Sequence, residues 1–205
     1  MIKNRIQAGK LLAEQIREKD SIVLAIPRGG VVVGAEIAKK LECSLDVVIS
    51  KKITPPDFPE YAIGAITHEG TIHKTSHWEQ FSNKPGFKEE LEKKQNEVKR
   101  RLEEYRGSSS YALGDKSIIL VDDGIATGAT VFAILEWLSS LGNKIILAIP
   151  VIPSDTYEKI QPFVSEIIAI EIPCDFSSVG QFYEEFEQVS DEQVKKILKK
   201  AQNHI

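Results

Sequence analysis

This chain of 205 residues has few cysteines, no net positive charge and no long hydrophobic segment. Its two cysteines, Cys43 and Cys174, match no metal-ligand spacing, and we expect both to be small buried side chains in a reducing compartment. The formal net charge of −4 gives no general attraction to nucleic acid. No apolar segment approaches membrane-spanning length, and the first residues lack the apolar core of a signal peptide. We therefore expect a cytoplasmic protein that binds neither nucleic acid nor membrane.

Short apolar segments alternate with amphipathic helical patterns outside the middle of the chain. Hydrophobic residues make up 42% of the sequence and charged residues 27%, an ordinary balance for a domain with a sizeable core. Such alternation predicts βαβ units and an α/β fold, with a mainly parallel sheet of about five strands flanked by helices. We expect strands at 21–26, 45–50, 118–121, 144–150 and 166–171 and helices at 5–19, 31–41, 129–141, 154–162 and 191–202.

The middle of the chain differs in composition from the rest. Residues 53–86 are rich in proline, glycine, histidine and threonine, and a β-hairpin is predicted at 68–70. Residues 87–106 predict a charged helix with a thin apolar stripe. An insertion this long favours a lid or a partner surface, although a plain solvated helix explains the pattern equally well. We predict one domain over residues 1–205, with its core at about 20–52 and 115–172 and an insertion at about 53–107.

The most informative segment covers residues 118–130. Four apolar residues lead into Asp122 and Asp123, and a loop of small residues follows before the next helical pattern. At the carboxyl end of a parallel strand, where α/β sheets bind ligands, both carboxylates can turn toward neighbouring groups. Ionised carboxylates only accept hydrogen bonds, so a pair of hydroxyl groups, such as those of a ribose, is a natural partner.

The loop after the two aspartates predicts an anion site. Where a loop enters a helix, unpaired backbone N–H groups lie at the positive end of the helix dipole and bind phosphate without a basic side chain. Gly124 and Gly128 permit close approach of the backbone, while Thr127 and Thr130 add hydroxyl donors. The segment is therefore typical of a ribose clamp followed by a 5′-phosphate cradle. The alternative is an ordinary turn at the aspartates with Thr127 as a helix cap.

Two further sets of residues follow strands at the same predicted edge. Pro27-Arg28-Gly29-Gly30 joins the first strand to a helix and combines a flexible backbone with a guanidinium, whose fork matches phosphate oxygens. A tight turn with a surface arginine is the alternative. Lys51 and Lys52 end the second predicted strand, so we expect one of them at this edge; the alternative is a solvated pair that begins a loop.

Residues 118–130 resemble the 5-phosphoribosyl-1-pyrophosphate (PRPP) binding motif of type I phosphoribosyltransferases, in which a hydrophobic run precedes two acids, small residues and Thr-Gly. The early Pro-Arg-Gly-Gly, Pro-Glu-Tyr-Ala-Ile-Gly-Ala at 59–65 and Val-Gly-Gln-Phe-Tyr-Glu-Glu-Phe at 179–186 extend the similarity to a prokaryotic group of predicted phosphoribosyltransferases with an undefined acceptor. The layout is similar as well, because that family carries a flexible active-site loop where the insertion lies.

The resemblance implies a role for each matched residue. Asp122 and Asp123 would hold the ribose hydroxyls and, with Arg28, form the catalytic group. Mg²⁺ would bridge pyrophosphate and ribose oxygens near the two aspartates and keep water ligands, without a full protein cage. The 5′-phosphate would lie on Gly124, Ile125, Ala126, Thr127, Gly128, Ala129 and Thr130, and the pyrophosphate on Arg28, Gly29, Gly30, Lys51 and Lys52.

Related phosphoribosyltransferases cover the sheet edge with a small hood that binds the base, which the resemblance would build here from about 1–19 and 173–205. Phe176, Phe182 and Tyr183 are the candidate base contacts, although they can equally be satellite core. Ala126 stands where 6-oxopurine enzymes carry an acid that meets the base, which counts against hypoxanthine or guanine. The implied partners are PRPP and a small-molecule base or nucleotide, and the fold is compatible with a homodimer.

The histidines predict no metal site, because His68, His73 and His77 lie within ten residues of each other yet lack any familiar zinc spacing. We expect them to be exposed in loops. The leading expectation is a Mg²⁺-dependent transferase of nucleotide metabolism that releases pyrophosphate. One alternative is a non-catalytic regulatory protein that binds PRPP or a nucleotide but has lost transfer. A second, a PRPP synthetase-like diphosphotransferase, is disfavoured because no separate ATP-binding feature stands in the sequence.

Overall fold

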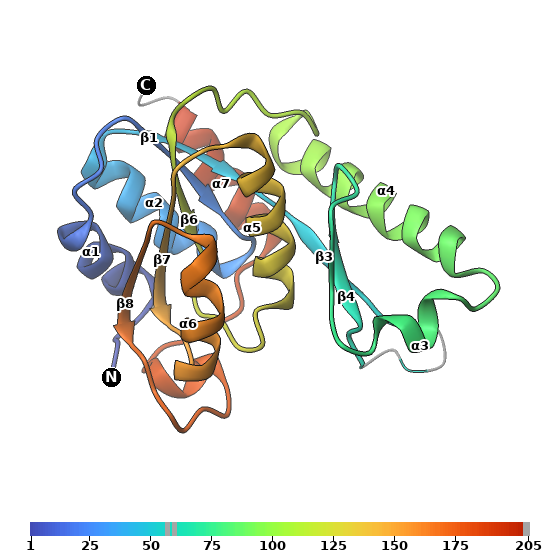
Figure 1. Ribbon diagram of the computed structural model, residues 1–205. Helices are drawn as coiled ribbons and strands as arrows, with labels where there is room; N and C mark the ends of the chain where they lie inside the picture. The colour runs from blue at the N-terminus through green and yellow to red at the C-terminus, as the bar shows by residue number, and fades with distance from the viewer. Residues whose placement is uncertain (56–57, 59–60, 203–205) are drawn as a thin grey trace. The chain divides into compact units, whose positions relative to one another are not determined.

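The computed structural model describes residues 1–55, 58 and 61–202, which form two compact units (Figure 1). The first unit contains Met1–Val48, Tyr111–Thr127 and the chain from Asn143 onward, and the second contains Ile49–Ser110 and Gly128–Gly142. Pro59 and Glu60, which belong to the matched motif at 59–65, lie outside the described residues. Each unit is built around its own sheet.

A five-stranded parallel sheet forms the centre of the first unit. Its strands, in spatial order, are β2 (Ser44–Val47), β1 (Ser21–Ala25), β6 (Ser117–Val121), β7 (Ile145–Val151) and β8 (Glu166–Glu171). Every residue of β1 and β7 is buried, and all of them except Ser21 are apolar. The predicted α/β fold with a parallel sheet of about five strands is therefore confirmed.

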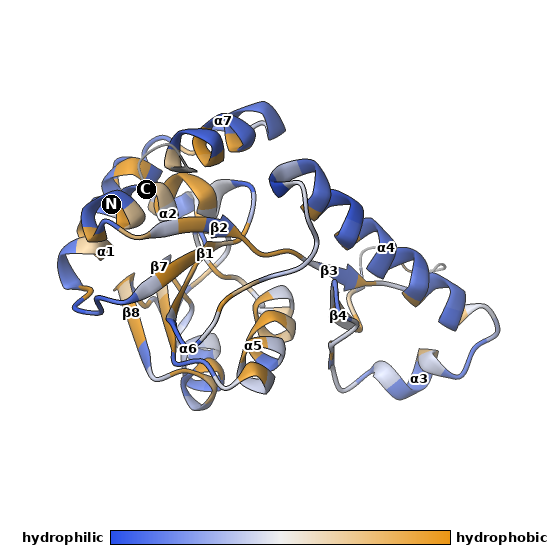
Figure 2. Cartoon of the chain, turned by 90° about the horizontal axis from the view of Figure 1, so that it is seen from above, coloured by the Kyte–Doolittle hydropathy of each residue, from blue (hydrophilic) through white to orange (hydrophobic). Residues whose placement is uncertain are grey.

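Helices lie on both faces of this sheet. Viewed from above, α1 (Arg5–Gln15), α2 (Gly29–Leu41) and α7 (Asp191–Gln202) lie on one side and α6 (Ser154–Ile160) on the other (Figure 2). α1 ends at Gln15 instead of continuing to residue 19, because the backbone becomes extended at Ile16. Ile16 is nevertheless buried, so the apolar pattern continues beyond the helix. No helix in the described ranges has both the length and the apolar composition to cross a membrane.

The two cysteines do not share one environment. Cys43 is half-buried, whereas Cys174 is exposed on the segment that follows β8. The prediction that both are buried side chains is therefore wrong for Cys174. The sequence could not show this, because a single small side chain in an irregular segment carries no periodic signal.

The second unit contains the three-stranded antiparallel sheet β3 (Ser50–Ile53), β4 (Gly64–Thr67) and β5 (Ile72–Lys74). Its helices are α3 (Trp78–Ser82), α4 (Phe87–Arg106) and α5 (Ala129–Leu141). The predicted hairpin at 68–70 and the predicted helix at 87–106 are confirmed. The insertion is thus a small folded layer with a hydrophobic core of its own, made of Ile53, Ile63, Ile66, Trp78 and Phe87.

The strand predicted at 45–50 is divided between the two sheets. β2 ends at Val47, and the chain enters β3 at Ser50, which places Lys51 and Lys52 inside an antiparallel strand. The expectation that these lysines end a parallel strand is therefore wrong. The apolar run continues through Val48 and Ile49, so the sequence pattern does not show where the chain changes its pairing partner.

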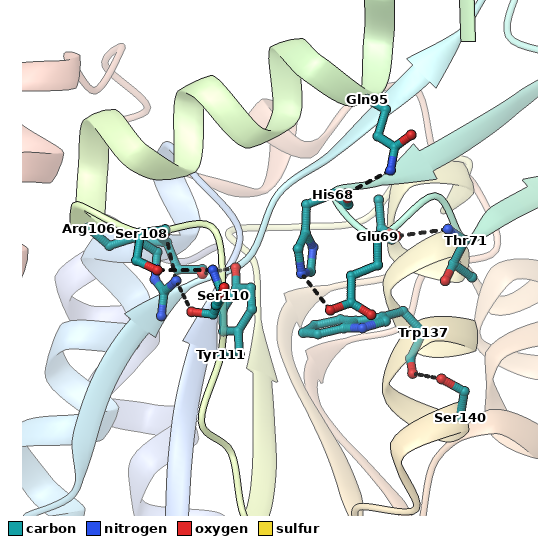
Figure 3. Close-up of polar contacts among 12 residues, drawn as sticks. His68, Glu69, Thr71, Gln95, Arg106, Ser108, Ser110, Tyr111, Trp137 and Ser140 are labelled. Atoms are coloured by element: carbon teal, nitrogen blue, oxygen red, sulfur yellow. Dashed lines mark hydrogen bonds and ion pairs between the residues drawn. The ribbon is translucent and has the colours of Figure 1, made fainter. Parts of the chain in front are cut away.

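His68 is buried, contrary to the expectation of an exposed loop residue, with 2% of its surface accessible. Its ring makes an edge contact with Trp137 of α5 at 4.8 Å between centroids, and its Nε2 lies 3.7 Å from Glu69 Oε1 (Figure 3). The backbone carbonyl of His68 accepts a hydrogen bond from Gln95 Nε2 at 2.9 Å. Burial lowers the pKa of His68 to about 4, although the charge of Glu69 opposes this shift.

We expect this histidine to make the protein less stable in acid. The unfolded chain takes up the proton near pH 6.5 and the folded protein only near pH 4, so His68 stabilises the fold above pH 6.5 and loses this contribution as the pH falls to 4. The free energy of unfolding should fall by about 3 kcal/mol over that range because of this one group. Urea denaturation at several pH values measures this change in the free energy of unfolding.

His68→Phe should remove this part of the pH dependence while keeping an aromatic ring against Trp137. The exposed His77 of the same unit offers a matched control position, because His77→Asn also replaces one histidine but leaves His68 in place. Equal pH dependence in His68→Phe and the wild type would show that His68 does not titrate as its burial predicts.

Candidate active site

The two predicted loops leave neighbouring strands of the first unit. Residues 27–30 follow β1, and Asp122 and Asp123 follow β6. The two strands are paired as far as Ala25 and Val121. Beyond this pair, the N–H of Ile26 donates to the carbonyl of Val121 at 2.8 Å. The peptide bond between Pro27 and Arg28 is cis. The structure therefore brings the basic, glycine-containing loop and the two aspartates together at the carboxyl edge of the sheet.

Gly29 and Gly30 allow the two loops to touch. A Cβ atom on Gly30 would lie 2.8 Å from Asp122 Cα and 2.9 Å from the carbonyl oxygen of Val121, which are both backbone atoms. A Cβ atom on Gly29 would overlap the carboxylate of Asp123. Any other residue at either position would force the loop after β1 or the aspartates to shift. Arg28 itself is exposed, and its Nη1 lies 4.0 Å from Asp191 Oδ1.

Asp122 is half-buried, and its Oδ1 accepts the backbone N–H of Asp123 at 2.8 Å. Loss of hydration raises the pKa of the Asp122 carboxyl well above its ordinary value, and the negative charge of Asp123 raises it further. Because the folded protein then binds this proton more tightly than the unfolded chain, ionised Asp122 lowers the stability of the fold at neutral pH. Carboxyl groups kept in such surroundings are candidates for a functional role.

Asp123 is held by two residues from outside its own loop. Arg5 Nε donates to Asp123 Oδ2 at 2.6 Å, and the hydroxyl of Tyr183 donates to the backbone carbonyl of Asp123 at 2.7 Å. The sequence reasoning missed Arg5 altogether, because an arginine in the first turn of an amphipathic helix is indistinguishable from an ordinary exposed charge. It named Tyr183, but as a base contact, and that role stays a prediction.

The first half of the predicted phosphate loop belongs to the first unit. A Cβ atom on Gly124 would overlap the side chain of Val179, so this position needs glycine. The N–H of Ile125 donates to the carbonyl of the last residue of β7 at 2.9 Å. The carbonyl of Ala126 accepts a hydrogen bond from Thr156 Oγ1 at 3.0 Å. These bonds fix the loop backbone, while the side chain of Ala126 stays exposed.

The second half of the loop begins α5 in the second unit. Gly128 has φ +74° and is the N-cap of α5, and none of the described residues caps this end through a side-chain hydrogen bond. The alternative in which Thr127 caps the helix is therefore wrong. The first N–H groups of α5 keep the hydrogen-bonding capacity that an anion would use, although their role in binding stays a prediction.

The remaining predicted site residues lie in different surroundings. Lys51 forms an ion pair with Glu97 of α4 in the second unit, and Lys52 is exposed. A contact of either lysine with pyrophosphate stays a prediction, because both lysines belong to the second unit. In the first unit, Phe176 and Phe182 stack with their ring centroids 6.0 Å apart. Their predicted contact with a base likewise remains a prediction.

Comparisons with known proteins show the family to which the chain belongs. The sequence matches the family described as the phosphoribosyl transferase domain over residues 2–185. A Mycobacterium tuberculosis protein named as a provisional phosphoribosyl transferase is 35% identical over 210 residues, which cover 97% of this chain and 46% of that protein. The chain thus spans about half the length of the curated relatives it matches.

Solved structures extend the comparison to the fold. The crystal structure of the TT1426 protein from Thermus thermophilus has a TM-score of 0.82 and 33% identity, over 97% of this chain and 98% of that one. The AQ2163 protein from Aquifex aeolicus, at 11% identity, shares the fold with a TM-score of 0.50 over 82% of this chain and 74% of its own.

The fold and the acidic edge of its sheet define a protein of the type I phosphoribosyltransferase class. The family match over nearly the whole described chain makes the assignment specific. The chain belongs to the phosphoribosyl transferase family, a family of pentosyltransferases.

Proposed function

We propose that this chain transfers the 5-phosphoribosyl group of PRPP to the nitrogen of a base or a similar acceptor and releases pyrophosphate. The observation that carries the proposal is the direct packing of Gly29 and Gly30 against Asp122 and Asp123. This packing places carboxylates suited to a sugar diol beside a loop suited to a diphosphate. The reaction is proposed for the cytoplasm, and a homodimer remains a prediction.

In the proposed reaction, the bond from ribose C1 to the pyrophosphate oxygen breaks and a bond from the acceptor nitrogen to C1 forms. The leaving pyrophosphate keeps the electron pair, and the acceptor nitrogen passes its proton to water or to the leaving pyrophosphate. Asp122 and Asp123 orient the ribose through its hydroxyl groups, and Arg28 with the backbone at Gly29 and Gly30 offsets the growing charge on pyrophosphate. The chain thereby contributes positioning and electrostatic stabilisation.

Asp122 and Asp123 offer the carboxylate oxygens that Mg²⁺ prefers. In the described part of the chain, no group of three or more histidine, cysteine, aspartate or glutamate side chains could hold a metal ion. This donor set fits a Mg²⁺ that takes most of its ligands from substrate and water. Bound there, the ion would offset the negative charge of the diphosphate.

Calorimetric titration with PRPP and Mg²⁺ tests the donor site, and we expect saturable heat with a dissociation constant of about 1 mM or tighter. A panel of nitrogenous bases, followed by a pyrophosphate assay, then tests transfer. Pyrophosphate released only with particular bases supports the enzyme and identifies the acceptor. PRPP binding without release from any base would favour the regulatory alternative, and absence of PRPP binding would overturn both.

A further inference from the structure

Arg5 is held on three sides by groups of the first unit. Its Nε donates to Asp123 Oδ2 at 2.6 Å, and its Nη1 donates to the backbone carbonyl of Glu187 at 2.7 Å. The guanidinium carbon lies 3.9 Å from the ring centroid of Phe186. Only 11% of the Arg5 side chain and 17% of the Asp123 side chain are exposed. An ion pair this well anchored and shielded has a defined geometry, unlike most surface pairs.

The ion pair lies directly against the loop after β1. A Cβ atom on Gly29 would lie 2.7 Å from Arg5 Nε and would overlap the Asp123 carboxylate. The guanidinium therefore lies within contact distance of the backbone at Gly29, where the proposed function places pyrophosphate. Two adjacent carboxylates at that point would repel an anionic ligand, and the charge of Arg5 offsets this repulsion.

The chain fixes Arg5 through the segment before α1. The N–H of Ile2 donates to the carbonyl of Phe182 at 2.8 Å, and the N–H of Glu184 donates back to the carbonyl of Ile2 at 2.9 Å. The Asn4 side chain accepts the N–H of Gln7 to cap α1 and donates to Glu185 Oε2 at 2.9 Å. These bonds bring the first turn of α1 beside the segment that carries Phe186 and Glu187.

We propose that Arg5 is a positioning residue for PRPP. It holds Asp123 Oδ2, which leaves Oδ1 for a ribose hydroxyl, and it offsets the charge of the aspartates beside the pyrophosphate loop. This inference rests on the proposed function, because it assigns Arg5 to the same site. Arg5 adds a cation that the matched PRPP motif does not contain. This cation comes from a helix more than a hundred residues away in sequence.

Arg5→Gln should weaken binding of PRPP with Mg²⁺ by about 10-fold or more, because it removes a charged donor from Asp123. In the kinetic assay this change should appear mainly in KM for PRPP. Arg17 is a matched control, since it is exposed in the same terminal segment and donates to the backbone carbonyl of the nearby Glu14. Arg17→Gln should bind PRPP like the wild type.

A double-mutant cycle with Asp123→Asn separates positioning from a general structural effect. If Arg5 acts mainly through Asp123, Arg5→Gln should weaken PRPP binding clearly less in the Asp123→Asn background than in the wild type, because the ion pair is already lost there. Equal losses in both backgrounds would contradict the proposal. If Arg5→Gln does not fold, Phe186→Leu, at an exposed ring, should still weaken binding measurably, because it removes one of the three groups that hold the guanidinium.

The outcomes distinguish this inference from the proposed function. No PRPP binding by the wild type would overturn the proposed function and this inference with it. PRPP binding by the wild type that Arg5→Gln leaves unchanged would overturn the inference alone. Tighter binding by Arg5→Gln would also overturn it, because Arg5 would then be competing with the ribose for Asp123.

Discussion

Asp122→Asn/Asp123→Asn protein should bind PRPP about 100-fold more weakly than the wild type, because each carboxyl group proposed to hold the ribose is replaced by an amide with a single oxygen acceptor. An asparagine keeps one oxygen acceptor and nearly the same volume, so the change removes charge with little change in packing. Arg5 can still donate to the amide oxygen at position 123, which keeps that buried guanidinium paired. The fold should therefore survive, and the loss should appear in ligand affinity.

Calorimetry with PRPP and Mg²⁺ measures this loss, and thermal unfolding verifies that the variant is folded. Asp155 on α6 supplies the matched control, because it is exposed and pairs with Lys159 of its own helix. Asp155→Asn should bind PRPP normally. Undiminished affinity in the folded double variant would remove the basis for placing the ribose at β6.

Gly30→Ala should lower kcat/KM for PRPP by about 100-fold, the order of effect expected from a displacement of about 1 Å at a reacting centre. The new methyl group would meet backbone atoms of β6 and the loop after it, at 2.8 Å from Asp122 Cα and 2.9 Å from the Val121 carbonyl. Backbone atoms cannot rotate away as the end of a flexible side chain can. The loop after β1 or the aspartates must therefore shift, with a loss of about 1–3 kcal/mol in unfolding free energy.

Pyrophosphate release at varied PRPP concentrations gives kcat/KM, and urea denaturation gives the stability. Gly114 is the control glycine in the same unit, because a Cβ atom there meets nothing within 4 Å, although its φ is +57°. Gly114→Ala should cost about 1 kcal/mol of stability through its backbone angle and leave kcat/KM intact. Wild-type kcat/KM in Gly30→Ala would mean that the contact of the two loops does not position substrate.

The sequence predicted the central strands of the parallel sheet well, because β1, β6 and β7 are nearly continuous apolar segments. The segment before Asp122 shows this most clearly, since four buried residues precede the two acids. Helices α4 and α5 also begin and end where the pattern predicts, because each carries a regular apolar face. The contact of the two loops followed from topology, because neighbouring parallel strands end at one edge.

Other features depend on contacts between distant residues and could not be predicted. The apolar run through Ile49 hides the point at which the chain leaves one sheet for the other. His68 is buried by a tryptophan almost seventy residues later in the sequence. Arg5 reaches Asp123 only because the chain pairs Ile2 with Tyr183. The roles of the loop residues, the lysines and the aromatic residues stay predictions until ligand binding is measured.

The loop after β6 is constrained differently at its different positions. Gly124 is fixed by the side chain of Val179, and the backbone of Ala126 is held by Thr156. Residue 126 itself, by contrast, is exposed. We therefore expect a longer side chain to be tolerated better at position 126 than at the glycines of the two loops, where an added Cβ atom meets neighbouring residues.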